Sequence, residues 1–165
     1  MIYRLDYGEM LNDFIELEQG AFSDIELACI TSEFQKIDKK PSEVNTSDES
    51  GGLVFPDFYY DEAVPLFSEE VFKAMKNEGV DNLMTKSITV VDALQEKSKK
   101  YILGLPPRIR VLDSVGKIDE GRLGNYMIFK VLDSSDNSIY ITQKLKDLFD
   151  SIRPLGMEII EADVL

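Results

Sequence analysis

Apolar and polar residues alternate in several short stretches of this chain, a spacing typical of β-strands with one side exposed to water. A first strand is expected over Tyr3–Tyr7 and a second over Phe14–Glu18. The segment 24–34 fits either a strand or a helix, and residues 92–100 are expected to form one helical turn or a polar loop. Apolar and β-branched runs predict further strands over 80–84, 88–91, 108–113, 126–132, 139–142 and 157–160.

Two segments show the spacing of amphipathic helices instead. The first is expected to begin after Ser68, whose hydroxyl can cap free backbone amides, and to end at Gly79. The second is expected to begin after Thr142, again as a cap, and to end at Pro154. The apolar stripes are Val71, Phe72 and Met75 in the first helix and Leu145, Leu148, Phe149 and Ile152 in the second. This pattern predicts an α+β fold with a mixed or antiparallel sheet, and it allows two related strand–helix–strand halves.

The organisation of the chain is predicted from its length and from one polar segment. A length of 165 residues favours a single domain. Pro41–Gly52 contains one apolar residue, Val44, and therefore cannot offset its ordering entropy by burial. We expect acidic strands within residues 1–40, a mobile loop over 41–54 and a core that holds both related halves over 55–165.

The residue types in the chain argue against most catalytic and metal chemistry. The absence of histidine removes the commonest general base and metal ligand. The single cysteine, Cys29, lies among apolar residues and is expected to be an inert core thiol. Three glycines lack the spacing of a phosphate loop and predict turns: Gly116, Gly121 and Gly124. The sequence thus predicts no enzyme, no catalytic residue, no cofactor and no bound metal.

The net charge of −13 is concentrated at the N-terminal end of the chain. Residues 1–63 hold 15 acids and four bases, a charge of −11, whereas residues 64–165 hold 16 acids and 14 bases. Nucleic acids and anionic membranes need a cationic surface, so neither is expected as a partner. The asymmetry favours an acidic surface that attracts a basic protein, with ordinary solvated surface charge as the alternative.

The densest mixture of acidic and aromatic residues lies just before the first predicted helix. It consists of Asp57, Tyr59, Tyr60, Asp61 and Glu62. Carboxylates close together can perform acid–base chemistry or bind a hard cation, but no motif fixes their spacing here. Contact with a partner protein and a plain surface are the other two interpretations. We take these five residues as the candidate partner-binding site.

Four stretches of the chain resemble a known family. They are Phe55–Phe58 leading to Pro65–Phe72, Tyr101–Leu103 followed by Arg110–Asp113, Tyr126–Lys130, and Tyr140–Thr142 followed by the last helix and strand. In these stretches the chain is similar to the bacterial polymorphic-toxin immunity proteins of family eleven and its close relatives. The matching positions are helix caps and core residues, so the resemblance transfers no functional residue. Thr142, where the family more often has serine, and Arg153–Leu155 before Gly156 depart from the family pattern.

The resemblance implies a protein that binds and silences a cognate secreted toxin inside the producing cell. The N-terminus has no apolar run fit for a signal peptide, and no segment has the apolar length of a membrane span, so a cytoplasmic protein is expected. We therefore expect stoichiometric binding, with an acidic face covering a basic site on the toxin domain. The alternatives are a small carboxylate-based enzyme and an acidic inhibitor that mimics nucleic acid.

Overall fold

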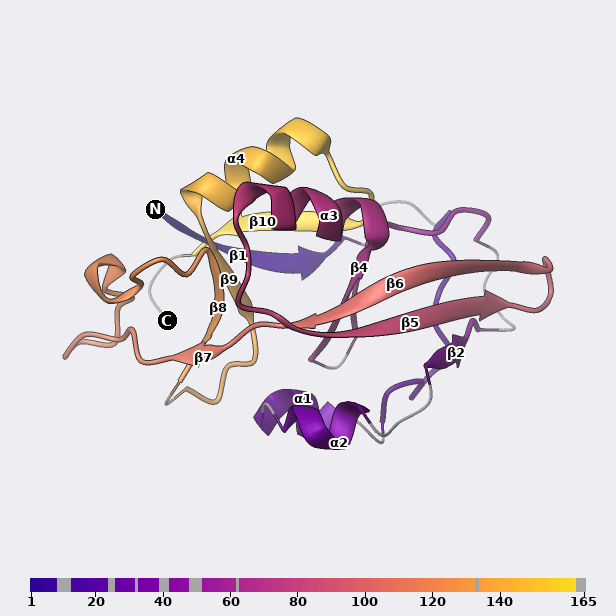
Figure 1. The fold of residues 1–165 in the computed structure, drawn as a ribbon, viewed down its shortest axis with the longest axis horizontal. Helices are drawn as coiled ribbons and strands as arrows, with labels where there is room; N and C mark the ends of the chain where they lie inside the picture. Colours follow the sequence, from indigo (N-terminus) through magenta and orange to yellow (C-terminus); the bar gives the residue numbers. More distant parts are fainter. Residues whose placement is uncertain are drawn as a thin grey trace.

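The computed structural model describes residues 1–8, 13–23, 26–31, 33–38, 42–47, 52–61, 63–132 and 134–162. Ten strands and four α-helices in these residues form two five-stranded sheets, which confirms the predicted α+β class (Figure 1). The strands are β1 (Ile2–Tyr7), β2 (Glu43–Asn45), β3 (Phe58–Asp61), β4 (Val64–Ser68), β5 (Met84–Asp92), β6 (Lys97–Leu105), β7 (Arg108–Ile109), β8 (Ile128–Val131), β9 (Ile139–Thr142) and β10 (Met157–Glu161). The helices are α1 (Glu26–Thr31), α2 (Phe34–Asp38), α3 (Glu69–Glu78) and α4 (Gln143–Ile152), with a short 3₁₀ helix at Glu120–Arg122.

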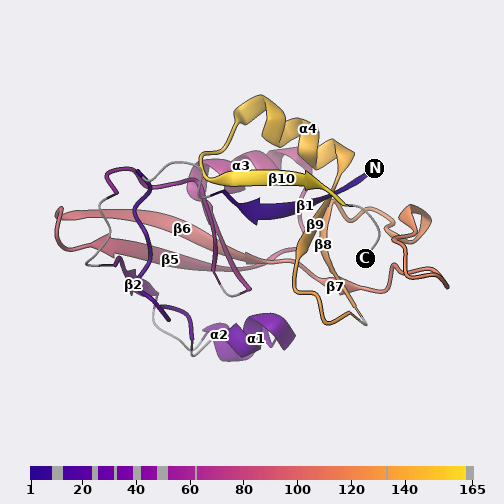
Figure 2. The same cartoon turned by 180° about the vertical axis from the view of Figure 1, so that it is seen from behind.

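The two sheets contain the same strand–helix–strand unit. In one sheet, with the order β2-β5-β6-β4-β3, strands β4 and β5 are joined by α3, and β6 lies between them antiparallel to both. In the other, with the order β10-β1-β9-β8-β7, strands β9 and β10 are joined by α4, and β1 lies between them antiparallel to both. The two predicted halves therefore share one topology, although the central strand of the second half comes from the N-terminus of the chain (Figure 2).

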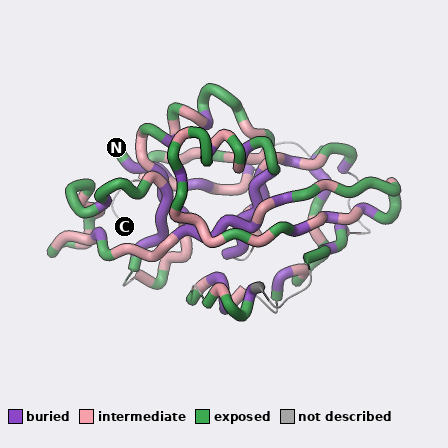
Figure 3. The backbone as a smooth tube through the Cα atoms, viewed as in Figure 1, coloured by how far each residue is buried: buried purple, intermediate pink, exposed green. Residues whose placement is uncertain are grey.

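The helices divide over two sides of the molecule, as both ribbon views show. Helices α3 and α4 lie together on one side of the long β5–β6 hairpin, and α1 and α2 lie on the other. The apolar stripes of α3 and α4 meet residues of β1, β3, β4 and β9 in one core cluster, in which Met75 and Leu145 are fully buried. A second cluster joins α1 and α2 to β4, β5 and β6. Figure 3 shows this burial concentrated in the strands. No helix in the described ranges combines the length and apolar character needed to cross a bilayer.

The caps of the two equivalent helices differ. Ser68 caps α3 as predicted, because its Oγ accepts a hydrogen bond of 3.3 Å from the backbone N–H of Val71, and Gly79 ends the helix in a left-handed conformation. Thr142 occupies the same position before α4, but its side chain makes no capping hydrogen bond. Its buried Oγ1 has no hydrogen-bond partner. The predicted cap at Thr142 is therefore wrong.

Other segments also differ from the sequence-based expectation. Residues 43–45, expected in a loop, form β2, because burial of Val44 and parallel pairing with β5 suffice for a short strand. Residues 97–100 belong to β6, since backbone pairing with β5 determines the strand although its side chains here are polar. The expected strand over 14–18 is reduced to isolated bridges, in which Phe14 pairs with Val54 and Leu17 with Thr46.

The expected strand over 108–113 is only two residues long, because the chain turns at Asp113. The carboxylate of Asp113 accepts hydrogen bonds of 2.9 Å from the backbone N–H groups of Val115 and Lys117. These bonds lower the pKa of Asp113 below its ordinary value. The segment 24–34, which fitted either element, contains α1.

Candidate functional site

A cleft of about 290 Å³ lies between the end of β1, the segment 16–20 and the outer strand β3. Its lining residues are Tyr7, Glu16, Leu17, Glu18, Gln19, Gly20, Tyr59, Tyr60 and Asp61. We call this the acidic cleft, because three carboxylates and no lysine or arginine stand among these nine residues. Three tyrosines give it apolar walls. It is the place where the N-terminal acidic charge and the predicted acidic–aromatic cluster come together.

The segment 16–20 is held in place by backbone hydrogen bonds to two distant parts of the chain. The N–H of Ile15 donates to the carbonyl of Val54 at 2.8 Å, and the N–H of Glu18 donates to the carbonyl of Asn45 at 3.0 Å. Ile15 is fully buried and anchors the segment, whereas the neighbouring Glu16 is exposed. The alternation noticed in the sequence therefore does turn the two glutamates of this segment outward, although it does not produce a regular strand.

The tyrosine wall of the acidic cleft is rigid. The ring of Tyr59 packs between those of Tyr7 and Tyr101, with centroid distances of 5.8 and 5.3 Å. The hydroxyl of Tyr59 donates to the carbonyl of Ile15 at 2.5 Å, so it ties β3 to the glutamate segment. Burial raises the pKa of Tyr59 well above its ordinary value, which keeps this hydroxyl neutral and in the donor role.

Tyr60 and the tip of the β3–β4 hairpin are attached from the other side through the half-buried Arg108 and the buried Lys130. The hydroxyl of Tyr60 donates to the backbone carbonyl of Asn137. The side-chain Oδ1 of Asn137 accepts a 2.6 Å hydrogen bond from Arg108. The ammonium group of Lys130 lies 3.4 Å from the carbonyl of Ala63, which follows the end of β3. The tip of the β3–β4 hairpin is thus attached to β7 and β8, and the cleft wall is fixed with it.

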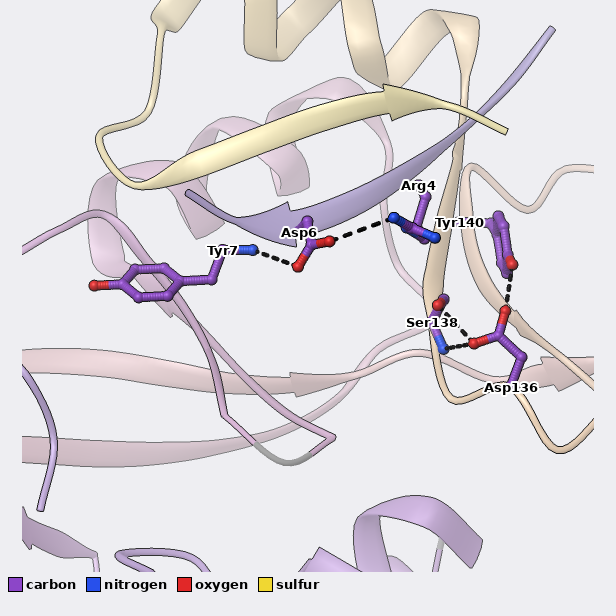
Figure 4. Close-up of polar contacts among 6 residues, drawn as sticks. All are labelled: Arg4, Asp6, Tyr7, Asp136, Ser138 and Tyr140. Carbon is purple, nitrogen blue, oxygen red and sulfur yellow. Dashed lines mark hydrogen bonds and ion pairs between the residues drawn. The ribbon is translucent and has the colours of Figure 1, made fainter. Parts of the chain in front are cut away.

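Figure 4 shows two separate groups of polar contacts near β1. Asp6 accepts a 3.0 Å hydrogen bond from the backbone N–H of Tyr7 and forms a 3.5 Å ion pair with Arg4. Further along, Asp136 accepts hydrogen bonds from Ser138 and Tyr140. Burial acts to raise the pKa of Asp136, but these hydrogen bonds outweigh it and hold the pKa below its ordinary value. Each group joins residues that are close in the sequence, which indicates a local structural role.

The structure gathers three of the five predicted site residues and separates a fourth. Tyr59, Tyr60 and Asp61 line the acidic cleft. Asp57 does not line it: its carboxylate accepts a 2.8 Å hydrogen bond from the N–H of Leu155 and lies 3.7 Å from the Lys99 ammonium. Asp57 therefore fastens the turn before β10 to the other sheet. The fifth residue of the prediction, at position 62, lies outside the described residues.

Six lining residues of the acidic cleft were not predicted from the sequence, and the charged or aromatic ones among them are Tyr7, Glu16 and Glu18. They lie more than 40 positions before Tyr59, and only the fold brings the segments together. The signal that could have found them was the alternation over 14–18 combined with the acidic excess of residues 1–63.

Two buried residues of reactive types, Cys29 and Lys130, do not line the acidic cleft. Cys29 is fully buried, and burial raises the pKa of its thiol to about 11, so it is protonated near neutral pH. Lys130 is also fully buried, and burial together with the Arg108 cation lowers its pKa to about 8. Within the described part of the chain, no group of three or more cysteine or carboxylate residues is placed to hold a metal ion.

Comparison with protein-family models finds no family that matches this chain, and comparison with curated proteins finds no matching protein.

Proposed function

We propose that this protein is a stoichiometric binding protein whose acidic cleft receives a basic segment of a partner protein. The observation that carries the proposal is the composition of the cleft: three carboxylates, three tyrosines and no basic residue among its nine lining residues. Carboxylates bind guanidinium and ammonium groups through charge-assisted hydrogen bonds, and the faces of tyrosine rings attract the same cations. An arginine or lysine side chain is the ligand that matches both kinds of wall.

The charge of the whole chain supports this proposal. A net charge of −13 creates a long-range field that accelerates the approach of a cationic protein. Fifteen of the 31 acids lie in the first 63 residues, which also supply every lining residue of the acidic cleft. The field and the cleft would therefore act on the same partner, the first in the encounter and the second in the bound complex.

Binding accounts for the acidic cleft better than catalysis does. A general base that works near neutral pH needs a proton affinity tuned to that range, usually by burial or by a charged neighbour. Two of the cleft carboxylates, Glu16 and Glu18, are exposed. The cleft tyrosines Tyr59 and Tyr60 have raised pKa values because they are buried, so they stay protonated. These groups are suited to hold a cation in place.

A secreted bacterial toxin is the partner that the family resemblance suggests. In this proposal the protein acts in the cytoplasm of the producing cell, where it occludes a basic site on the toxin domain. The test is co-expression with candidate toxin domains encoded by neighbouring genes, measured as bacterial growth and as a complex of the two purified proteins. Restored growth and a 1:1 complex are expected. Growth arrest despite normal levels of this protein, with no complex, would contradict the proposal.

A matched pair of charge variants connects the function to the acidic cleft. Reversal of Glu16, Glu18 and Asp61 to lysine should abolish both the rescue of growth and the complex. The control reverses three exposed acids of other surfaces: Glu96, Glu158 and Glu161. Both variants change the net charge by the same amount, so a loss confined to the first assigns binding to the cleft. Equal behaviour of the two would contradict this assignment.

A further inference from the structure

The acidic cleft lies between two strand edges that belong to one curled sheet. One edge is β3, which ends the sheet and pairs only with β4 among the described strands. At the other end of the sheet β2 pairs with β5, as Figure 1 shows, and its continuation, residues 45–47, pairs with segment 16–18. Residues of segment 16–18 and of β3 both line the acidic cleft, so the two ends of the sheet face each other across it.

The backbone groups of Leu17 point into the space between the two edges. Both neighbours of Leu17 direct backbone groups to residues 45–47: Glu18 through its N–H and Glu16 through its carbonyl. Because successive residues of a strand direct their backbone groups to opposite sides, the N–H and carbonyl of Leu17 face away from residues 45–47. That side is the side of β3, because the carbonyl of Ile15, two positions earlier, accepts the hydrogen bond from a β3 tyrosine.

The backbone groups of Tyr60 point into the same space from the other edge. The carbonyl of Asp57 accepts a 2.7 Å hydrogen bond from the N–H of Ser68, which sets the alternation of hydrogen bonds between β3 and β4. By this alternation the N–H and carbonyl of Tyr60 face away from β4. The residue opposite Tyr60 is Pro65, which has no N–H to donate. No described backbone hydrogen bond joins segment 16–18 to β3.

The space between the edges has an apolar side and an acidic side. Tyr59 belongs to the core cluster around β4, β5 and β6, and Leu17 packs against the same cluster, so both edges turn this side inward. Glu16 and Glu18 precede and follow Leu17 and are exposed on the outer side. A strand between the two edges would therefore place every second side chain against the core and the others beside the two glutamates.

We propose that the basic segment of the partner enters the acidic cleft as an extended strand, which pairs with Leu17 on one side and with Tyr60 on the other. Basic and apolar residues alternate along this strand: the basic ones lie beside Glu16 and Glu18, and the apolar ones face the core. This inference rests on the proposed function and adds the conformation and the residue pattern of the bound segment. The charge of the cleft alone would not require two strand edges that face each other.

The test uses the purified full chain and the capped pentapeptide Lys-Val-Lys-Val-Lys, followed by NMR of backbone amides. The peptide should bind saturably and shift the resonances of residues 16–18 and 59–61. Amide hydrogen exchange at Leu17 and Tyr60 should slow at least about tenfold, because these amides gain a partner. The amide of Glu18 is the control: it is already hydrogen-bonded within the fold and should change less. The acidic peptide Glu-Val-Glu-Val-Glu should bind at least about tenfold more weakly.

Two N-methylated peptides test the pairing at each edge without any change to the protein. One carries the methyl groups on the amides of both valines, and the other on the amides of the second and third lysines. Alternate amides of an inserted strand face opposite edges, so each of the two peptides should bind about tenfold more weakly than the parent peptide. A strand held at one edge would lose binding with only one of them, and a segment held by its side chains alone with neither.

The outcomes separate this inference from the proposed function. Weakening of neither or only one N-methylated peptide would overturn the strand and leave the acidic cleft as the binding site. A dimer of this chain that already protects Leu17 and Tyr60, or no saturable binding at millimolar peptide, would also overturn the strand. Equal binding of the parent peptide by the natural chain and by the variant that reverses Glu16, Glu18 and Asp61 to lysine would overturn both ideas.

Discussion

Replacement of Lys130 by methionine should stabilise the protein. Lys130 lies in β8 with no exposed surface, and its ammonium group has a single described hydrogen bond, of 3.4 Å, to the carbonyl of Ala63. The neighbouring cation of Arg108 adds repulsion. A buried charge with so few partners costs desolvation free energy that it does not recover, and methionine fills a similar volume without the charge. The change therefore removes a cost while keeping the core filled.

The size of the effect is worked out from the pKa of Lys130. Burial and Arg108 lower that pKa from 10.5 to about 8. With about 1.36 kcal/mol for each tenfold change in proton affinity, the difference corresponds to roughly 3 kcal/mol near pH 7. Loss of the hydrogen bond to Ala63 opposes this gain and lowers the free energy of unfolding by about 1 kcal/mol. Lys130→Met should therefore raise the free energy of unfolding by about 1–3 kcal/mol near neutral pH.

The pH dependence gives this prediction a sign that can be tested. Between pH 8 and 10.5 the unfolded chain keeps the Lys130 proton and the folded chain releases it, so the stability of the natural protein rises with pH over this range. Methionine has no proton to lose. The advantage of Lys130→Met should therefore shrink by roughly 1 kcal/mol between about pH 7 and pH 9.

Urea unfolding of both proteins across this pH range measures the difference between their free energies of unfolding. Both proteins contain Cys29 and the same tyrosines, so the titration of these groups cancels in the difference. Lys73→Met, at an exposed position of α3, is the control and should change stability little at any pH. A Lys130→Met variant destabilised by several kcal/mol would show that the buried charge is well stabilised. A gain that stays constant with pH would show that the charge is not its cause.

Three further predictions concern single contacts in the fold. Ser68→Ala should lower the free energy of unfolding by about 1 kcal/mol, because it removes the cap of α3. Thr142→Val should leave the free energy of unfolding equal or slightly higher, because the buried Oγ1 that it removes has no hydrogen-bond partner. Thermal unfolding of the two variants tests both expectations. Gly156→Ala should destabilise the protein, because φ of Gly156 is +82° and an added Cβ would lie 2.8 Å from the Cβ of Pro56. An unchanged melting temperature would refute this prediction. Tyr59→Phe should lower the free energy of unfolding by about 1–3 kcal/mol, because it removes the hydrogen bond to the buried carbonyl of Ile15. Amide hydrogen exchange in segment 13–18 should become faster in this variant.

The parts of the fold that the sequence predicts well are those where local pattern and tertiary packing agree. Strand β1, helix α3 with its cap at Ser68 and helix α4 all show a clear apolar spacing, and each buries residues of the side that this spacing marks. Strand β10 was also predicted, although its apolar residues are only partly buried. The class of the fold and the related halves follow from these elements. The cap at Thr142 could not be predicted in the same way, because the orientation of one hydroxyl depends on its neighbours in the core.

The parts that the sequence does not predict depend on contacts between distant segments. Strand β2 has one buried apolar residue, Val44, and forms because β5 offers a partner edge. The acidic cleft is a similar case, because Tyr59–Asp61 stand out as a local cluster but Glu16 and Glu18 do not. Tertiary hydrogen bonds bring their segment to the cluster: from Ile15 to Val54, from Glu18 to Asn45 and from the Tyr59 hydroxyl to Ile15. Asp57 was predicted from the local density of acidic and aromatic residues, but its carboxylate instead accepts a hydrogen bond in the turn before β10.

The central claim, that the acidic cleft binds a basic partner, is tested most directly by association kinetics over a salt series with the proposed partner, a purified toxin domain. The natural protein should associate fast at low salt and more slowly as salt rises, because charges are screened within about 10 Å at 0.1 M ionic strength. Reversal of Glu16, Glu18 and Asp61 to lysine should slow association and also speed dissociation, whereas reversal of Glu96, Glu158 and Glu161 should change the association rate alone. Equal dissociation rates for the two variants would contradict the assignment of the cleft.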